Sequence, residues 1–123
     1  MTFTRLLLST FVAIAAAGHA SAQDATAGAA VFKQQCGVCH SVVADKNVVG
    51  PSLFGVVGRK AGTIPGFHYS AANQASGLTF DAATLDRYLT SPATVVPHTI
   101  MPYAGLKDAQ KRADLIAYLA TLH

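Results

Sequence analysis

The stretch Cys36-Gly37-Val38-Cys39-His40 decides how the rest of this sequence is interpreted, and it contains both cysteines of the chain. Residues three apart share one face of a helical turn, so both sulfurs can reach the same edge of a flat group while His40 follows directly. This C-x-x-C-H spacing attaches c-type haem, whose two vinyl groups take the thiols and whose iron takes the histidine. The motif therefore predicts one haem c, bound covalently through Cys36 and Cys39, with His40 as an iron ligand.

Two other kinds of site share the Cys-x-x-Cys part of this motif. A thioredoxin-like redox pair needs a strand-helix-strand context, and the sequence has no alternating strand and helix pattern. A zinc site needs two further ligands near the pair. Neither alternative uses the adjacent histidine, so the haem interpretation is favoured.

Length and composition describe one small domain. The chain has 123 residues, of which 51% are apolar and 12% charged, with glycine and proline scattered rather than clustered. These values exclude a multidomain enzyme, a disordered chain and a coiled coil. The formal net charge is only +3, and no cluster of Lys and Arg with aromatic residues occurs, so we expect no nucleic-acid partner.

The N-terminal segment has the pattern of a secretory signal. Arg5 is followed by an apolar run over residues 6–17 and then by Ala20-Ser21-Ala22. The alternative is a membrane anchor, but this run is shorter than the roughly 20 residues that a membrane-spanning helix needs. We therefore expect residues 1–22 to be a cleaved signal peptide, and residues 23–123 to be the functional domain in the periplasm.

Hydrophobic periodicity predicts an all-α fold. The expected helices cover residues 25–35, 71–75, a segment from a cap at Thr79 or Asp81 to just before Pro92, and a segment from near Asp108 to the C-terminus. Gly28 on the first helix is small enough to let the last helix approach closely. The long segment between His40 and Thr79 is rich in Gly and Pro and can wrap a prosthetic group, but it cannot form a regular sheet. We expect the haem to complete the core, and the haem-free chain to be largely unfolded.

The sixth position on the iron has few candidate ligands. In residues 23–123 the only methionine is Met101, and it lies in a loop bracketed by Pro97 and Pro102. Such a loop can hold a thioether rigidly. His98 and His68 are the alternative ligands, but Met101 is predicted to bind the iron.

Beyond this motif, an ordered series of residues carries a resemblance that covers the whole of residues 23–123. The matching positions are Gly28, Phe32, Gly50-Pro51-Ser52-Leu53, Gly58-Arg59-Lys60, Pro65-Gly66-Phe67, residues 69–73, Tyr88-Leu89, Pro97, Met101, Ala104-Gly105 and residues 114–119. On these residues the chain resembles the class I cytochromes c, of the mitochondrial cytochrome c and bacterial cytochrome c2 type. The resemblance implies a small single-domain fold whose helices wrap around one haem c.

The resemblance also implies roles for residues beside the two ligands. In similar proteins the carbonyl at the position of Pro51 accepts the imidazole N–H of the haem-binding histidine, here His40. Tyr88 matches a tyrosine that hydrogen-bonds near the methionine sulfur, here that of Met101.

Further matches surround the haem propionates of similar proteins. Arg59, Tyr69 and Thr99 occupy such positions, where donors and a positive charge offset two carboxylates. Phe80 stands where most members have a tryptophan whose indole N–H donates to a propionate. This departure removes a donor and is expected to lower the potential, unless water or Asn73 substitutes for it.

Two other departures concern the loop and the docking face. His98 stands where the family usually has glycine next to the proline, and its proximity to Met101 allows ligand exchange at alkaline pH. Mitochondrial members surround the exposed haem edge with lysines, whereas this chain has Gln35, Ala93, Thr94 and Ile100 at those places. We therefore expect a partner surface that is less acidic, or a contact that is more apolar.

The resemblance implies an electron-transfer protein rather than an enzyme. It would cycle iron between Fe(II) and Fe(III), carrying one electron at a time between respiratory or dehydrogenase complexes. We expect redox protein partners, some of them membrane-bound, with no small-molecule substrate and a monomeric state. The alternative is a haem enzyme or gas sensor with a labile sixth ligand, which would need a distal acid–base residue.

Overall fold

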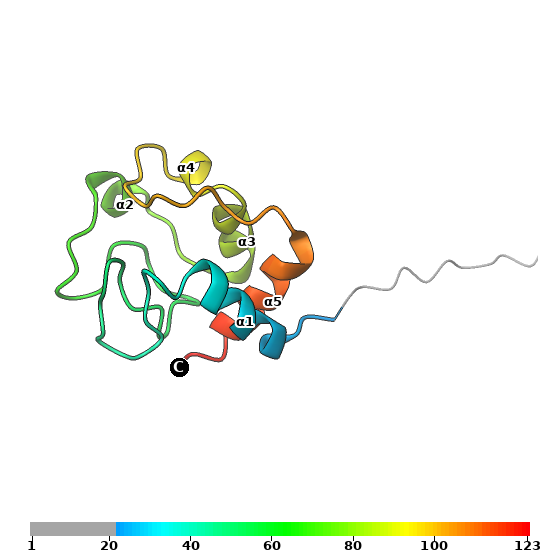
Figure 1. Ribbon diagram of the computed structural model, residues 1–123. Helices are drawn as coiled ribbons and strands as arrows, with labels where there is room; N and C mark the ends of the chain where they lie inside the picture. The colour runs from blue at the N-terminus through cyan, green and yellow to red at the C-terminus, as the bar shows by residue number, and fades with distance from the viewer. Residues whose placement is uncertain (1–21) are drawn as a thin grey trace, which may run out of the picture.

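The computed structural model describes residues 22–123, and it is built from helices and loops. The helices in chain order are α1 (Ala25–Gln35), α2 (Ala71–Ala75), α3 (Ala82–Thr90), α4 (Pro92–Val95) and α5 (Ala109–Leu119) (Figure 1). The only β pairing among these residues is an isolated antiparallel bridge between Lys60 and Thr79. The prediction of an all-α domain is therefore confirmed. None of the described helices has the length and apolar character needed to cross a membrane.

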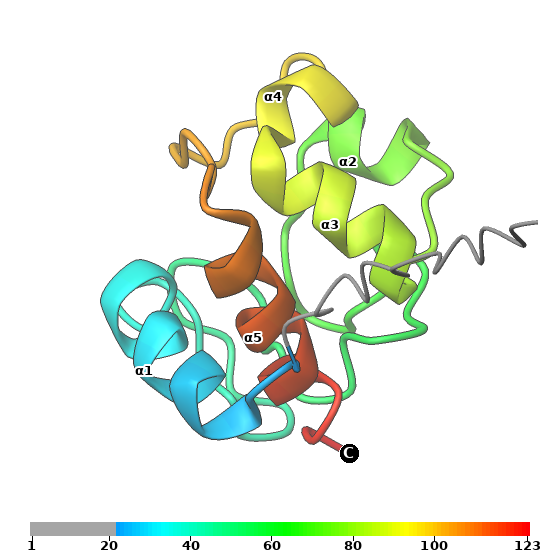
Figure 2. The same cartoon turned by 90° about the vertical axis from the view of Figure 1, so that its right-hand side faces the viewer.

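Helices α1 and α5 form the closest contact in the fold, and they lie side by side in Figures 1 and 2. A β-carbon placed on Gly28 would lie 1.9 Å from the backbone oxygen of Asp114, so only glycine permits this approach. The rings of Phe32 and Tyr118 pack with centroids 5.7 Å apart. The side chain of Asp114 also accepts the backbone N–H of Asp24 at 2.9 Å. The predicted pairing of the first and last helices is thus observed.

Side-chain caps fix where the helices begin. Asp24, Ser70, Asp81 and Asp108 each accept backbone N–H groups from the first turn that follows them. Of the two caps considered for α3, Asp81 is the one used, and its carboxylate accepts the Thr84 N–H at 2.7 Å. This hydrogen bond holds the pKa of Asp81 below its usual value.

The structure corrects two expected boundaries. Helical structure resumes at Pro92 as the short helix α4, which the sequence did not predict; proline fits the first helical position because that residue needs no N–H donor there. The last helix ends at Leu119 instead of continuing to the C-terminus. Beyond it the chain turns, and the carbonyl of Leu122 accepts the N–H of Gly55 at 2.5 Å.

The core lies where the helices meet the long irregular segment. Leu115 is fully buried, and Leu85 and Leu119 are 3% exposed. In Figure 1 the segment after α1, drawn from cyan to green, lies on the opposite side of the molecule from α5. The fold thus places two different surfaces opposite each other: regular helices on one side and loops on the other.

Candidate functional site

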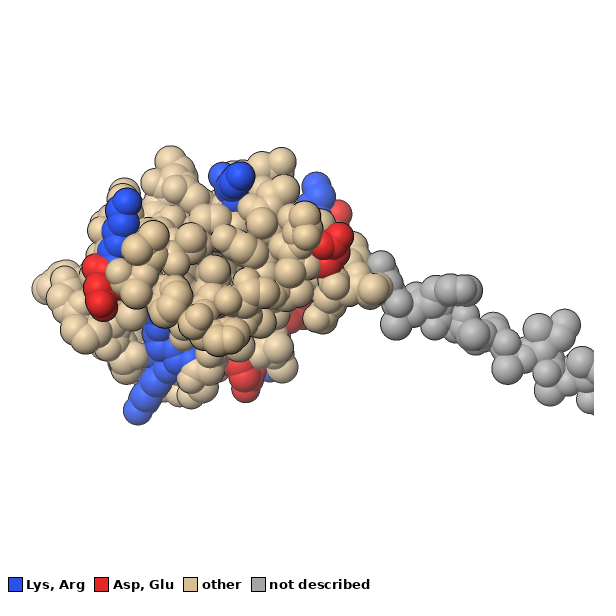
Figure 3. All heavy atoms as spheres, turned by 90° about the horizontal axis from the view of Figure 1, so that it is seen from below, with Lys and Arg blue, Asp and Glu red and all other residues tan. Residues whose placement is uncertain are grey.

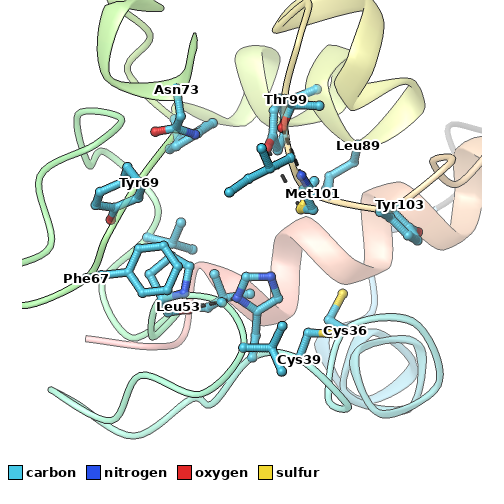
Figure 4. Close-up of a pocket in the computed structure, with 18 of the residues that line it drawn as sticks. Cys36, Cys39, Leu53, Phe67, Tyr69, Asn73, Leu89, Thr99, Met101 and Tyr103 are labelled. Carbon is cyan, nitrogen blue, oxygen red and sulfur yellow. Dashed lines mark hydrogen bonds between the residues drawn. The ribbon is translucent and has the colours of Figure 1, made fainter. Parts of the chain in front are cut away.

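A cavity of about 370 Å³ separates these two surfaces. Its walls are mainly apolar and include Leu85 and Leu89 from α3, Leu119 from α5, and Leu53 and Val56 from the loop side. Figure 4 shows the cavity with side chains converging on it from all around. A pocket of this size and character suits a large planar organic group.

The cavity collects every residue that the sequence singled out for the site. These residues are Cys36, Cys39, His40, Pro51, Arg59, Tyr69, Asn73, Phe80, Tyr88, Thr99 and Met101. By contrast, His68 and His98, the alternative iron ligands, are exposed and do not line it. His123 is likewise exposed at the C-terminus.

The attachment motif follows directly on the end of α1. The backbone N–H of His40 donates to the carbonyl of Cys36 at 2.9 Å, so the motif forms one helical turn as its spacing predicted. Both cysteines are free thiols. Burial, together with the neighbouring Cys39, raises the pKa of the Cys36 thiol to about 11. No group of three His, Cys, Asp or Glu side chains that could hold a metal ion occurs within residues 22–123.

The imidazole of His40 is fixed from one side. Its Nδ1 lies 2.8 Å from the carbonyl oxygen of Pro51, and since a carbonyl only accepts, Nδ1 carries the proton. The other ring nitrogen, Nε2, keeps its lone pair as an iron ligand requires. A β-carbon on Gly50 would come within 2.2 Å of the His40 ring, so this position needs glycine.

Met101 lies on the segment between α4 and α5, residues 96–108, called here the Met101 loop. Its backbone N–H donates to the Thr99 hydroxyl at 3.3 Å, and the Tyr88 hydroxyl lies 4.0 Å from its sulfur. Burial raises the pKa of Tyr88, so its phenol is a proton donor at neutral pH. In Figure 4 Met101 and Cys39 project from separate segments toward the same space.

Arg59 brings a positive charge to the cavity wall. Its guanidinium donates to the carbonyl of Ser52 at 2.8 Å and also to the carbonyl of Phe54. Burial lowers the pKa of Arg59, although arginine stays charged in proteins. Nearby, the Tyr69 hydroxyl accepts the N–H of Ile64 at 3.1 Å. Among the described residues Arg59 has no carboxylate partner, so the charge is available to an anionic group.

Asn73 and Phe80 complete this part of the wall. The Oδ1 atom of Asn73 is buried without a hydrogen-bond partner among the described residues. A buried amide of this kind is costly unless a bound group pairs with it. The Phe80 ring packs against that of Tyr88, with centroids 5.2 Å apart, and contributes no hydrogen bond.

Sequence reasoning missed Tyr103, which also lines the cavity. Its hydroxyl donates to Oε1 of Gln35 at 3.1 Å. Burial is the main cause that raises the pKa of Tyr103, and the neighbouring Cys36 adds to it. An aromatic residue two places after Met101 was the available signal, but nothing in the sequence indicated its partner.

The side chains that converge on this cavity suit each part of haem c. Two thiols stand one helical turn apart, an imidazole nitrogen and a thioether sulfur can bind iron, and the apolar walls suit a porphyrin. The positive charge of Arg59, which has no carboxylate partner among the described residues, suits its carboxylates. The residues present therefore fit the group.

Comparisons with known proteins agree with this fit. A model of the cytochrome c family matches residues 25–123. The chain is 55% identical to cytochrome c2 of Rhodomicrobium vannielii over 84% of its own length and 82% of the relative, and 48% identical to cytochrome c2 of Blastochloris viridis over 94% and 91%. Among solved structures it resembles cytochrome cH from Methylobacterium extorquens, with a TM-score of 0.75 and 46% identity over 80% of this chain and 98% of that one.

The chain belongs to the cytochrome c family, and its class I fold is the one that the sequence predicted. Membership confirms one covalently bound haem c and a role in electron transfer between redox proteins rather than in enzymatic catalysis.

Proposed function

We propose that this protein is a soluble one-electron carrier whose haem iron is bound by His40 and Met101. The observation that carries the proposal is the meeting of these two side chains in one apolar cavity with both cysteines of the attachment motif. When bound, the haem would supply an Fe(II)/Fe(III) couple, and with both His40 and Met101 bound the iron would keep no position for a substrate.

The protein's contribution to this couple begins at His40. The hydrogen bond to Pro51 fixes the tautomer, orients the ring and increases the basicity of Nε2. Gly50 leaves room for this ring beside the backbone. These contacts keep the imidazole in one position in both oxidation states, which favours rapid electron transfer.

On the other side, Tyr88 and Thr99 position Met101. The hydroxyl of Thr99 accepts a hydrogen bond from the Met101 N–H. The hydroxyl of Tyr88 lies 4.0 Å from the Met101 sulfur and makes a weak contact with it. A donor near the sulfur withdraws electron density from the thioether, so Tyr88 tunes the ligand as well as placing it.

Arg59, Tyr69 and Asn73 are proposed to face the haem carboxylates, with Thr99 on the adjoining loop. Arg59 supplies charge, and Asn73 can donate to a carboxylate only through its amide nitrogen, since its unpartnered Oδ1 is an acceptor. Phe80 supplies packing alone, since its ring has no donor. We therefore expect a midpoint potential below that of relatives with a tryptophan at this position.

Electrons are proposed to pass to and from partners at the rim of the cavity. This rim is apolar. Val38, Val49 and Ile100 line the cavity and are 82%, 68% and 72% exposed, respectively. In Figure 3 charged side chains lie mainly around the margin of the visible face and leave a broad uncharged area between them. We infer that its redox partners meet this rim with a weakly charged surface.

A salt titration tests this docking mode. Between low and physiological ionic strength we expect the bimolecular electron-transfer rate with its partner to fall less than about threefold, because weak fields leave little to screen. A fall of tenfold or more would contradict the apolar docking mode but not the carrier function.

We further propose that residues 1–22 are a cleaved signal peptide and that residues 23–123 act as a monomer in the periplasm. Apart from Ala22, the signal segment lies outside the described residues. Its support is the pattern of Arg5, an apolar run and Ala20-Ser21-Ala22. Mass measurement of the protein isolated from its host should give a chain that begins at Gln23. An intact N-terminus in the membrane fraction would favour the anchored alternative.

The visible to far-red absorption spectrum tests the function directly. We expect a low-spin c-type spectrum with the weak far-red sulfur-to-iron band in the oxidised protein, and no response of the reduced protein to carbon monoxide. A high-spin spectrum or ready carbon monoxide binding would contradict Met101 ligation and favour the haem enzyme or gas sensor.

A further inference from the structure

The Met101 loop is held mostly by bonds within itself. The Tyr103 N–H donates to the Met101 carbonyl at 2.9 Å, and the Met101 N–H donates to the Thr99 hydroxyl. At the far end the Leu106 N–H donates to the Leu89 carbonyl at 2.8 Å and anchors the loop to α3. The middle of the loop therefore depends on side chains for its attachment to the rest of the fold.

Two polar side-chain contacts join Met101 and Tyr103 to other segments among the described residues, in addition to the packing of both side chains against the core. One is the long contact of Tyr88 with the Met101 sulfur, at 4.0 Å. The other is the Tyr103–Gln35 hydrogen bond, which at 3.1 Å has ordinary length and joins residues 68 positions apart. It is therefore the stronger of the two links across the cavity mouth.

Gln35 is a firm attachment point for this bond. It is the last residue of α1 and directly precedes Cys36, the residue to which a bound haem would be attached covalently. In addition, α1 is held against α5 through the close approach at Gly28. A bond from Tyr103 to this residue thus ties the loop to the closely packed pair of helices α1 and α5.

We propose that Tyr103 and Gln35 form a clasp that keeps Met101 on the iron and resists its displacement by small external ligands. The proposal rests on the proposed His40/Met101 ligation. Met101 and Tyr103 share one turn through their backbone bond, so a movement of the loop backbone that carries the sulfur away from the iron also moves the tyrosine. Tyr103 is accordingly a positioning residue, which acts on the iron through Met101.

Binding of imidazole to the oxidised holoprotein measures the clasp, because imidazole must displace Met101 to reach the iron. In Tyr103→Phe, which removes only the hydroxyl, we expect imidazole to bind about three- to tenfold more tightly, as loss of one hydrogen bond predicts. Gln35→Leu removes the acceptor and should give the same increase. The double variant should match either single variant, because both break one bond.

Two matched controls separate the clasp from a general loss of packing. Gln35→Glu keeps an acceptor and should bind imidazole as the unmodified protein does. Tyr118→Phe removes a hydroxyl from α5 that makes no hydrogen bond to a described residue, and it should also leave binding unchanged. The far-red band should persist in all variants, since Met101 still binds when imidazole is absent.

The outcomes distinguish this proposal from the one on which it rests. If the unmodified protein lacks the far-red band, Met101 ligation fails and the clasp fails with it. If the band is present but Tyr103→Phe and Gln35→Leu bind imidazole with unchanged affinity, or if their effects add in the double variant, the clasp alone is overturned.

Discussion

The α1/α5 pair and the wall of the cavity are built on opposite principles. In the helix pair, backbones touch at Gly28 and the contact is complete without any other group. In the wall, loops present apolar side chains and a lone buried amide, that of Asn73, to a space that the chain itself does not fill. The protein thus supplies its own helical scaffold but relies on haem to fill the cavity.

Removal of the haem should destabilise the fold more than any single substitution. A chain prepared without haem, such as Cys36→Ser/Cys39→Ser, should lose most of its helical signal, because the wall side chains then face water and a small helix pair cannot offset the entropy of ordering the rest. Far-UV circular dichroism at increasing temperature measures this. A native helical signal with a cooperative melt would mean that the scaffold is stable alone.

Substitution of Gly28 tests the contact between α1 and α5. In Gly28→Ala the added β-carbon meets the backbone of Asp114, so we expect the free energy of unfolding to fall by about 3 kcal/mol. Urea unfolding of the holoprotein gives this value. As a matched control, Gly37→Ala places a β-carbon no closer than 3.4 Å to its neighbours and should cost little. Equal losses in the two variants would contradict a special role for the α1/α5 approach.

A substitution of Phe80 tests how the cavity wall influences the midpoint potential. If the lost donor matters, Phe80→Trp should raise the midpoint potential by about 40 mV, equivalent to about 1 kcal/mol for one electron. A higher midpoint potential means that the ferrous state is favoured, and redox titration measures it. Phe80→Leu, which adds no donor, serves as the control. An unchanged or lower potential in the tryptophan variant would count against the proposed interaction with a propionate.

The smallest expected effect concerns strain in the Met101 loop. His98 is exposed and adopts a φ of 65°, a left-handed conformation that disfavours residues with a β-carbon. His98→Gly should therefore raise the free energy of unfolding by about 0.5 kcal/mol, whereas His98→Ala should not. Paired urea titrations decide this, and equal effects of glycine and alanine would mean that the conformation costs nothing.

The sequence predicted the parts of this molecule that depend on local spacing. The attachment motif singled out Cys36, Cys39 and His40, the proline-bracketed loop singled out Met101, and all four line one cavity, while ligation by His40 and Met101 stays a prediction. The bounds of α1 and α2 also agree with the prediction, since caps and periodicity lie within them.

Features that depend on distant contacts were harder to predict. The sequence does not predict α4, because a proline after a helical segment indicates the end of that helix, whereas Pro92 is also the first residue of the next one. The Tyr103–Gln35 bond joins segments 68 positions apart, and no periodicity connects them. Resemblance to relatives supplies matched positions but does not by itself predict which side chains meet in space.

Contact between α1 and α5 has a consequence for proteolysis. It closes nearly the whole described chain into one loop, so a single cut within that loop does not free either piece. Trypsin cleavage after the exposed Lys46 would leave one fragment with α1 and the cysteines and another with α5 and Met101. The nicked protein should migrate as one species on gel filtration and as two fragments after denaturation. Intact size under native conditions is therefore no measure of an unbroken backbone.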